Sequence, residues 1–421
     1  MGPAASQRAV GVTARRAAAV LVAEVLDHGR TLDDALTASR SFGALEGRDR
    51  AFARAIASTT LRRLGGLDAV LAQYLQRPLP DGAALARSIL RTGAAQLLAM
   101  GSPAHAVVSE AVGLARGARS AAPFAGLINA VLRKVAGSGN EAFAALPPGA
   151  DLPDWLFARW SAAHGQDTAN AIARALRAEP PLDLTPKADP EGWAARLGGR
   201  VIDARTVRID SGGEIAALPG FSAGDWWVQD AAASAPVTLL GDLAGLDVAD
   251  LCAAPGGKTM QLAHAGANVT AVDISAPRLQ RVAENLARTQ LAATLVEADA
   301  LKWAPERQFD VVVLDAPCSA TGTLRRHPDV AWLRRPSDIP ALVALQTSLI
   351  DRAIELVKPG GRLLYAVCSL EPEEGPGVVE AALARAEGRI APTDAVLHTT
   401  PATHADEGGM DGFYARVLVR A

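Results

Sequence analysis

The chain has 421 residues, a length that predicts about two or three domains rather than a single core. Nearly half of its residues are hydrophobic and 21% are charged, and no apolar run approaches the roughly 20 residues of a membrane helix, so we expect a soluble protein without a membrane partner. The three cysteines, Cys252, Cys318 and Cys368, are too few for a disulfide framework and predict a protein of the reducing cytoplasm.

The formal net charge of −3 is unevenly distributed along the chain. Residues 1–140 hold 17 Lys and Arg against 9 Asp and Glu, whereas the remaining residues hold 25 against 36. A basic front part on an acidic body suggests that the front part contacts a polyanion such as RNA. A basic surface that is merely solvated explains the same numbers, and charge alone does not choose between the two.

The front part has the periodicity of amphipathic helices. Apolar residues recur every three or four positions from Thr13 to about Val135, in a sequence rich in Ala and Leu. Breaks in this pattern come near Gly29, Gly65, Pro78 to Pro80 and Pro103. The pattern predicts an all-α domain over residues 1–140, whose last helix we expect to stop at Gly137 and Gly139.

Residues 150–240 read as a smaller, mixed unit. Helical periodicity runs through about Trp155 to Arg177, and prolines at positions 180, 181 and 186 then break it. Short strand-like pieces follow, such as Thr206 to Asp210. We expect a small α+β connector here.

From Leu246 onward, strand and helix patterns alternate. The expected strands are Leu246–Leu251, Asn268–Asp273, Ala293–Glu297, Asp310–Asp315 and Gly361–Cys368. This alternation predicts a doubly wound, Rossmann-like α/β domain with a parallel sheet over residues 241–421. The apolar run Gly412 to Val419 follows a Gly-rich turn and is expected to add an antiparallel hairpin at the sheet edge.

A glycine-rich loop follows the first of these strands, at the end of the sheet where ligands bind. It reads CAAPGGKT, residues 252–259. Its glycines let the backbone approach a ligand closely, and the N-terminus of the next helix attracts a carboxylate or phosphate. The loop is not a Walker P-loop, because the first glycine of that motif would fall at Cys252, and it is not the GxGxxG of dinucleotide enzymes.

Two acidic residues at strand ends fit a nucleoside-containing cofactor. Asp273 ends the second strand about 20 residues after the loop, where a carboxylate can accept both hydroxyls of a ribose. Asp299 follows the third strand and is placed to meet the adenine edge. Each has an alternative: Asp273 followed by Ser275 could cap a helix, and Asp299 could be a solvated turn residue.

Two cysteines lie at the carboxyl ends of the last two expected strands. Asp315 closes the apolar fourth strand with Cys318 three residues further on, and Cys368 closes the fifth. A lone buried cysteine usually acts as a small hydrophobic residue. Two thiols in one cleft, beside a carboxyl that can hydrogen-bond a heterocycle, indicate a catalytic site. We expect no metal, because histidines such as His264 and His327 do not supply zinc-ligand spacing.

These motifs resemble those of the Nop/Sun family of RNA cytosine-C5 methyltransferases. The front part resembles the NusB-like domain of the bacterial members that act on small-subunit ribosomal RNA. The supporting segments are Gly43–Arg63, Pro103–Gly113 and Gly126–Lys134 in the front part, Gln229-Asp230 before the glycine-rich loop, and Asp411-Gly412-Phe413-Tyr414 near the end.

The sequence departs from the family pattern at three places. Val367 stands before the second cysteine, where the family commonly has Thr. The usual acidic and Asn-containing run after that cysteine appears as residues 371–376, EPEEGP, and the connector's usual Arg-Val-Asn segment appears as Leu184 to Lys187. None of these departures touches the residues expected to carry the chemistry.

The resemblance implies S-adenosylmethionine-dependent methylation of cytosine C5 in RNA, specifically small-subunit (16S) ribosomal RNA, by a monomeric enzyme. It implies that Cys368 attacks C6 of the base, that Asp315 bonds the ring near N3 with Lys258 nearby, and that Cys318 helps to remove the C5 proton or release the adduct. The residues that it implies for cofactor binding are Cys252, Ala253, Ala254, Pro255, Gly256, Gly257, Lys258, Asp273, Arg278, Asp299 and Asp315.

Three alternatives stay open at this point. A DNA cytosine methyltransferase would use Cys318 as the nucleophile instead of Cys368. Methylation of an adenine amino group is disfavoured, because the fourth strand ends in DAPC rather than in the Asn/Asp-Pro-Pro-aromatic motif of those enzymes. A non-catalytic NusB-like assembly or antitermination factor would bind RNA without transferring a methyl group.

Overall fold

The computed structural model describes residues 3–210 and 213–421, which form two compact units. The helical unit extends to Glu179 and includes Leu324–Arg335, and the sheet unit comprises Pro180–Thr323 and Pro336–Ala421. The boundary at Glu179 falls inside the expected 150–240 connector, and the division into three domains stays a prediction. In the described part of the chain, no helix combines the length and apolarity needed to span a bilayer.

The helical unit is built around α6 (Ala84–Leu98), which packs against α1, α4, α5, α7 and α8. Its helices are α1 (Pro3–His28), α2 (Leu32–Ala38), α3 (Arg40–Gly43), α4 (Gly47–Arg62), α5 (Leu64–Tyr74), α7 (Ala104–Arg116), α8 (Ala125–Ala144), α9 (Asp154–His164), α10 (Gln166–Ala175) and α15 (Val330–Leu333). This confirms the expected all-α front part, and α9 and α10 account for the helical periodicity of the expected connector.

The expected end of α8 at Gly137 and Gly139 is wrong, because the helix continues to Ala144. Gly139 is buried, and a Cβ at that position would lie 3.2 Å from the Leu98 side chain and 3.5 Å from that of Val70. The glycine therefore permits close packing of α8 against α6 and α5. This packing outweighs the roughly 1 kcal/mol by which glycine disfavours a helix interior.

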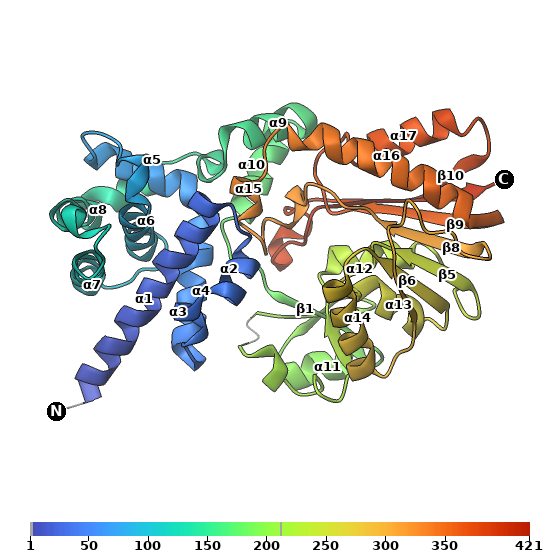
Figure 1. The fold of residues 1–421 in the computed structure, drawn as a ribbon, viewed down its shortest axis with the longest axis horizontal. Coiled ribbons are helices and arrows are strands. Elements are labelled where there is room, and N and C mark those ends of the chain that lie inside the picture. The colour runs from blue at the N-terminus through green and yellow to red at the C-terminus, as the bar shows by residue number, and fades with distance from the viewer. Residues whose placement is uncertain (1–2, 211–212) are drawn as a thin grey trace. The chain divides into compact units, whose positions relative to one another are not determined.

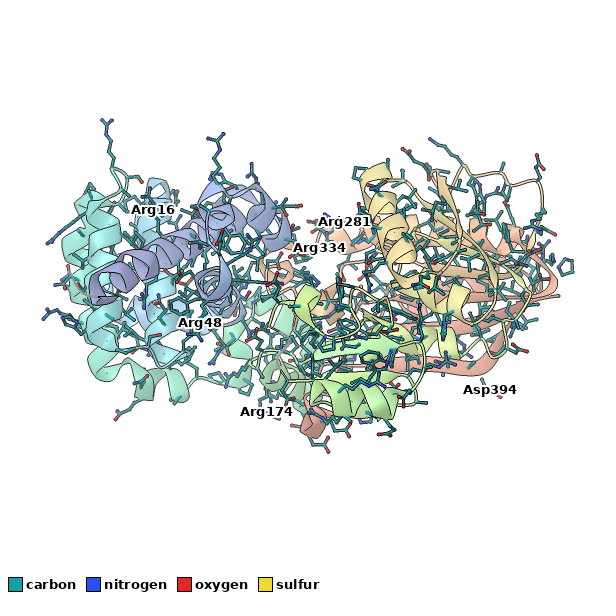
Figure 2. The ribbon with its side chains drawn as sticks, turned by 90° about the horizontal axis from the view of Figure 1, so that it is seen from below. Arg16, Arg48, Arg174, Arg281, Arg334 and Asp394 are labelled. Atoms are coloured by element: carbon teal, nitrogen blue, oxygen red, sulfur yellow. The ribbon has the colours of Figure 1, made fainter. Side chains whose placement is uncertain are left out.

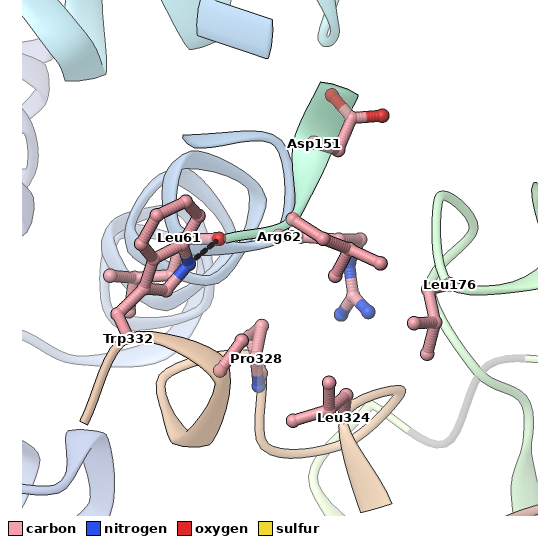
Figure 3. Close-up of a pocket in the computed structure, with 9 residues that line it drawn as sticks. Leu61, Arg62, Asp151, Leu176, Leu324, Pro328 and Trp332 are labelled. Atoms are coloured by element: carbon pink, nitrogen blue, oxygen red, sulfur yellow. Dashed lines mark hydrogen bonds between the residues drawn. The ribbon is translucent and has the colours of Figure 1, made fainter. Parts of the chain in front are cut away.

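The segment Leu324–Arg335 follows the Cys318 motif in sequence but packs within the helical unit. The buried Asp329 carboxylate accepts a hydrogen bond from the Leu32 backbone N–H at 3.0 Å. The Trp332 indole donates to the Leu61 carbonyl at 2.8 Å, in the last turn of α4 where carbonyls lack helical partners (Figure 3). A cavity of about 10 Å³ beside this bond contains none of the expected site residues; its lining includes Arg62, Asp151, Leu176, Leu324 and Pro328.

The sheet unit has a seven-stranded sheet of order β10-β11-β9-β8-β5-β6-β7. Its strands are β5 (Asp247–Leu251), β6 (Asn268–Asp273), β7 (Thr294–Glu297), β8 (Phe309–Asp315), β9 (Val357–Val367), β10 (Ile390–Thr399) and β11 (Phe413–Arg420). Strands β5 to β9 are parallel, and β10 and β11 are antiparallel. The five expected strands and the hairpin at the edge are confirmed, and β10 is a strand that the sequence analysis did not identify.

Helices cover both faces of this sheet (Figure 1). On one face lie α16 (Asp338–Leu356) and α17 (Pro376–Arg385), and on the other lie α12 (Ala231–Thr238), α13 (Gly257–His264) and α14 (Ala276–Thr289). In β8, Val312 and Leu314 join the core under α16, whereas Val311 and Val313 join the core under α12. Burial on both faces explains why the strand is a continuous apolar run.

A second, four-stranded antiparallel sheet precedes the large one in sequence. Its order is β2-β3-β1-β4, with β1 (Leu182–Pro186), β2 (Arg200–Asp203), β3 (Thr206–Ile209), β4 (Trp226–Val228) and the helix α11 (Pro190–Leu197). A fully buried pair joins β1 to β3, with the Arg208 Nε and Nη2 atoms 2.6 and 2.7 Å from the two Asp183 oxygens. Asp183 also accepts the Ala231 N–H at 3.0 Å, which fixes this sheet to the start of α12.

Candidate active site

The site lies where the strand order of the large sheet reverses. Strand β5 is flanked by β6 on one side and by β8 on the other, and all three are parallel. The connections after β5 and β8 therefore diverge to opposite sides, which leaves room for a ligand at the carboxyl ends of the strands. The glycine-rich loop and Asp315 meet at this point.

The backbone of the glycine-rich loop has the conformation needed for close approach. Cys252 and Gly256 have φ angles of +59° and +99°, in the left-handed region, and a Cβ on Gly256 would lie 3.1 Å from the Val282 side chain. Helix α13 begins at Gly257, so its first N–H groups lack helical acceptors and can bind an anion. Burial raises the pKa of Cys252 to about 12, so this thiol stays neutral.

Asp273 connects the end of β6 to the glycine-rich loop. Its carboxylate is buried and accepts the Ala254 N–H at 3.1 Å and the Ser275 N–H at 3.0 Å. Arg278 donates to the Ala254 carbonyl at 2.6 Å and lies 3.7 Å from the same carboxylate. The N-cap residue of α14 is Ser275 and no side chain caps this helix, so the capping alternative for Asp273 is wrong. The ribose role stays a prediction.

Asp299 occupies the turn after β7. Its carboxylate accepts the Leu301 N–H at 3.0 Å, and its carbonyl accepts the Lys302 and Trp303 N–H groups at 2.8 Å. These bonds are those of an ordinary turn residue. An additional contact to an adenine edge stays a prediction.

Lys258 and Asp315 form an ion pair at the centre of the site. The Lys258 Nζ lies 2.7 Å from an Asp315 oxygen and 4.8 Å from the centroid of the Phe413 ring. Lys258 is 6% exposed, whereas a third of the Asp315 side chain reaches solvent. The ammonium is thus held by a carboxylate and an aromatic face, and the carboxylate stays accessible to a ligand.

The structure brings the two cysteines into direct contact. The Sγ atoms of Cys318 and Cys368 are 3.4 Å apart, a thiol hydrogen bond between the ends of β8 and β9. Cys318 is 9% exposed, and Cys368 is half-buried and more accessible. The hydrogen bond to Cys368, burial and the charge of Glu374 raise the pKa of Cys318 well above its ordinary value, so Cys318 keeps its proton.

Two glycines hold the closing motif against the Cys318 loop. The Gly412 N–H donates to the Gly322 carbonyl at 2.8 Å, and a Cβ on Gly322 would lie only 2.0 Å from the Gly412 oxygen. One oxygen of Asp230 accepts the N–H groups of both Ala232 and Asp411, at 2.9 and 3.0 Å. These contacts explain why Gln229-Asp230 and the closing motif, distant in sequence, belong to one site.

The sequence analysis missed four polar residues that surround the cysteines. Ser319, Gln346, Ser369 and Glu374 are all buried and bonded to one another. Glu374 lay in a departure from the family pattern, and the two serines lay in the cysteine motifs, but none was given a role. The signal that could have found the two serines is that each directly follows a cysteine. In the described residues, no cluster of three or more His, Cys, Asp or Glu is arranged to hold a metal ion.

Comparison with known proteins assigns both parts of the chain. The family described as 16S rRNA methyltransferase RsmB/F matches residues 239–417, and the NusB family matches residues 12–137. The ribosomal RNA small subunit methyltransferase B of Xanthomonas campestris pv. campestris is 38% identical over 99% of this chain and 99% of its own length. The chain belongs to the RsmB/F family of 16S rRNA methyltransferases.

Further similarities agree with this RsmB/F assignment. The protein of the same name from Pseudomonas putida is 38% identical over 96% of this chain and 98% of its own. The crystal structure of PH0851 has the same fold, with a TM-score of 0.75 at 22% identity, over 96% of this chain and 98% of that one. The expected family, the two-part fold and the class of enzyme, an S-adenosylmethionine-dependent rRNA methyltransferase, are confirmed.

A buried carboxyl in β5 supports the RsmB/F glycine-rich loop from below. Asp250 is fully buried and accepts a hydrogen bond from the Thr259 hydroxyl at 2.6 Å, which joins β5 to α13. Burial raises the pKa of Asp250 from 3.8 to about 7, although the Thr259 bond opposes the shift. Folding therefore favours the protonated form of this carboxyl.

We predict a pH-dependent stability difference between the native protein and Asp250→Asn. Because the folded pKa of Asp250 lies above its unfolded value, its contribution to stability is fully present below about pH 4 and is lost as the pH rises through about 7. The amide cannot ionise, so the urea midpoint of Asp250→Asn should rise relative to that of the native protein as the pH increases from 5 to 8. A difference that does not change with pH would show that Asp250 does not titrate in this range.

Proposed function

We propose that this enzyme methylates C5 of a cytosine in 16S rRNA through a covalent adduct between Cys368 and C6 of the base. The observation that carries the proposal is the contact between the two thiols, 3.4 Å apart, in the same site as the ion pair of Asp315 and Lys258. S-adenosylmethionine is the methyl donor. The more accessible cysteine is the one proposed as the nucleophile.

The chemistry of cytosine requires a nucleophilic side chain. C5 of the ring is too weak a nucleophile to take a methyl group until a thiolate adds to C6 and breaks the aromaticity. Cys368 is accessible at the end of β9, whereas Cys318 is buried and protonated. Asp315 is exposed enough to bond the ring near N3, and Lys258 balances the charge of that carboxylate.

Release of the product reverses the first step. The C5 proton passes to a water molecule, and the electrons of the C5–H bond form the C5–C6 double bond. The bond between C6 and the Cys368 sulfur breaks at the same time, and its electrons stay on the sulfur as a thiolate. Cys318 lies where its S–H can donate a hydrogen bond to that thiolate. A neutral Cys318 therefore helps the adduct to separate.

The residues around the glycine-rich loop fit the cofactor. Bound S-adenosylmethionine supplies an activated methyl group. The N–H groups at the start of α13 suit its carboxylate, and Asp273 suits its ribose. The remaining contacts are assigned to Asp299, to Arg278 and to the loop residues that the resemblance implies.

The helical unit is proposed to bind the RNA. The front of the chain carries the positive charge, and exposed arginines such as Arg16 on α1 and Arg48 on α4 extend from its helices (Figure 2). The target cytosine must leave its stack to reach the thiols, which costs least in a loop of the RNA. We propose that the enzyme acts as a monomer in the bacterial cytoplasm, where rRNA is made.

We predict that Asp273→Ala weakens S-adenosylmethionine binding. Losing the ribose contact should cost on the order of 1 to 3 kcal/mol, a drop in affinity of about 5- to 150-fold by calorimetry. Glu284→Ala, which removes an exposed carboxylate from α14, is the control and should bind as the native protein does. Unchanged affinity in Asp273→Ala would refute the ribose assignment.

The two cysteine variants test the nucleophile directly. Cys368→Ala cannot attack C6, so we expect no methyl transfer and no RNA adduct on denaturing gels. Cys318→Ala still allows attack and methyl transfer but slows release, so a covalent complex of protein and RNA should accumulate. The reverse pattern, with adduct in Cys368→Ala and none in Cys318→Ala, would make Cys318 the nucleophile, as in the DNA enzymes.

A further inference from the structure

One buried carboxylate connects the two cysteine loops. Glu374, in the loop before α17, is fully buried. Its Oε1 accepts the Ser319 N–H at 2.8 Å, and its Oε2 accepts the hydroxyls of both Ser319 and Ser369. Because Ser319 follows Cys318 and Ser369 follows Cys368, a single side chain holds the backbone on the carboxyl side of each thiol.

Two other residues fix Glu374 itself. Gln346 on α16 donates to the Glu374 Oε1 and to the Pro317 carbonyl, each at 2.9 Å. The Tyr365 hydroxyl, on β9, donates to the Glu374 backbone carbonyl at 2.6 Å. The carboxylate thus receives four hydrogen bonds, from α16 and from both cysteine loops, which is the number needed to satisfy a buried anion.

Glu374 acts on the two thiols through its negative charge as well as through its hydrogen bonds. It disfavours a second anion nearby, and it adds to the increase in the pKa of Cys318 that the hydrogen bond to Cys368, burial and the charge of Cys368 already cause. The neutral Cys318 can then serve as the donor in the bond to Cys368, and Cys368 is the partner left to carry the reactive charge. The charge of Glu374 and its hydrogen bonds therefore both favour Cys318 as the protonated donor and Cys368 as the nucleophile.

We infer that Glu374 is a positioning residue for the methylation reaction: it holds Cys318 and Cys368 at hydrogen-bonding distance and keeps Cys318 as the protonated member of the pair. The inference rests on the proposed function for its effect on turnover. Its effect on the ionisation of the thiols does not depend on RNA or on methyl transfer, so the two can be tested separately.

The test is Glu374→Gln in the full-length protein, since the amide keeps the shape and one acceptor but removes the charge. We expect kcat to fall by roughly 10- to 100-fold, less than the roughly 100- to 10,000-fold that a group transferring the proton itself contributes. The KM for RNA and the affinity for S-adenosylmethionine should stay unchanged. Ultraviolet titration of the thiolates without RNA should show one thiol ionising at lower pH than in the native protein. In Glu374→Gln combined with Cys318→Ala that shift should disappear.

Two further variants control the interpretation. Glu380→Gln removes an exposed carboxylate from α17 and should leave both kcat and the titration unchanged. Ser369→Ala removes one bond to Glu374 and keeps the charge, so kcat should fall while the titration shifts less than in Glu374→Gln.

The outcomes separate this inference from the proposed function. A titration of Glu374→Gln identical to that of the native protein, together with an unchanged kcat, would overturn the inference. A shifted titration in a protein that transfers no methyl group to RNA would support the role of Glu374 in the cysteine pair and would contradict the proposed function instead.

Discussion

The parallel pairing of β8 with β9 is the constraint on which the rest of the site depends. It aligns Asp315 with Ala366, and the ladder continues past the end of β8 through the Ala316 N–H and the Ala366 carbonyl at 2.9 Å. The Gly322 N–H then donates to the Cys368 carbonyl at 3.0 Å. Two thiols 50 residues apart in the sequence meet because their strands are neighbours and end at the same edge.

The polar groups behind this edge are buried, so the specific partners that they find matter, although one Asp250 oxygen and the Gln346 amide oxygen have none in the described part of the chain. Asp250 bonds Thr259 and supports the glycine-rich loop, and Asp183 pairs with Arg208 and fixes the start of α12. Glu374 does the same for the cysteine loops. Breaking one such pair leaves an uncompensated buried group, which is costly, so these interactions define one arrangement of the loops rather than merely adding stability.

Much of this site could be predicted from the sequence because it follows from the period of the strands and from the positions of rare residues. The sequence places Asp315 at the end of an apolar strand and two of the three cysteines at strand ends. The sheet confirms that these residues lie at the carboxyl ends of β8 and β9. The packing partners could not be predicted. Helix α8 passes through Gly139 because of contacts with α5 and α6, and Leu324–Arg335 packs in the helical unit; neither has a local signature. Glu374 was visible only as one acidic residue among several, since its role depends on burial.

Above all, we propose that the protein makes 5-methylcytosine in 16S rRNA. Bisulfite sequencing of 16S rRNA from cells with and without the gene tests it most directly. We predict a cytosine that resists conversion in the parent strain, becomes convertible when the gene is deleted, and is restored by the native gene but not by one encoding Cys368→Ala. An identical conversion pattern in the parent and the deletion strain would contradict the account.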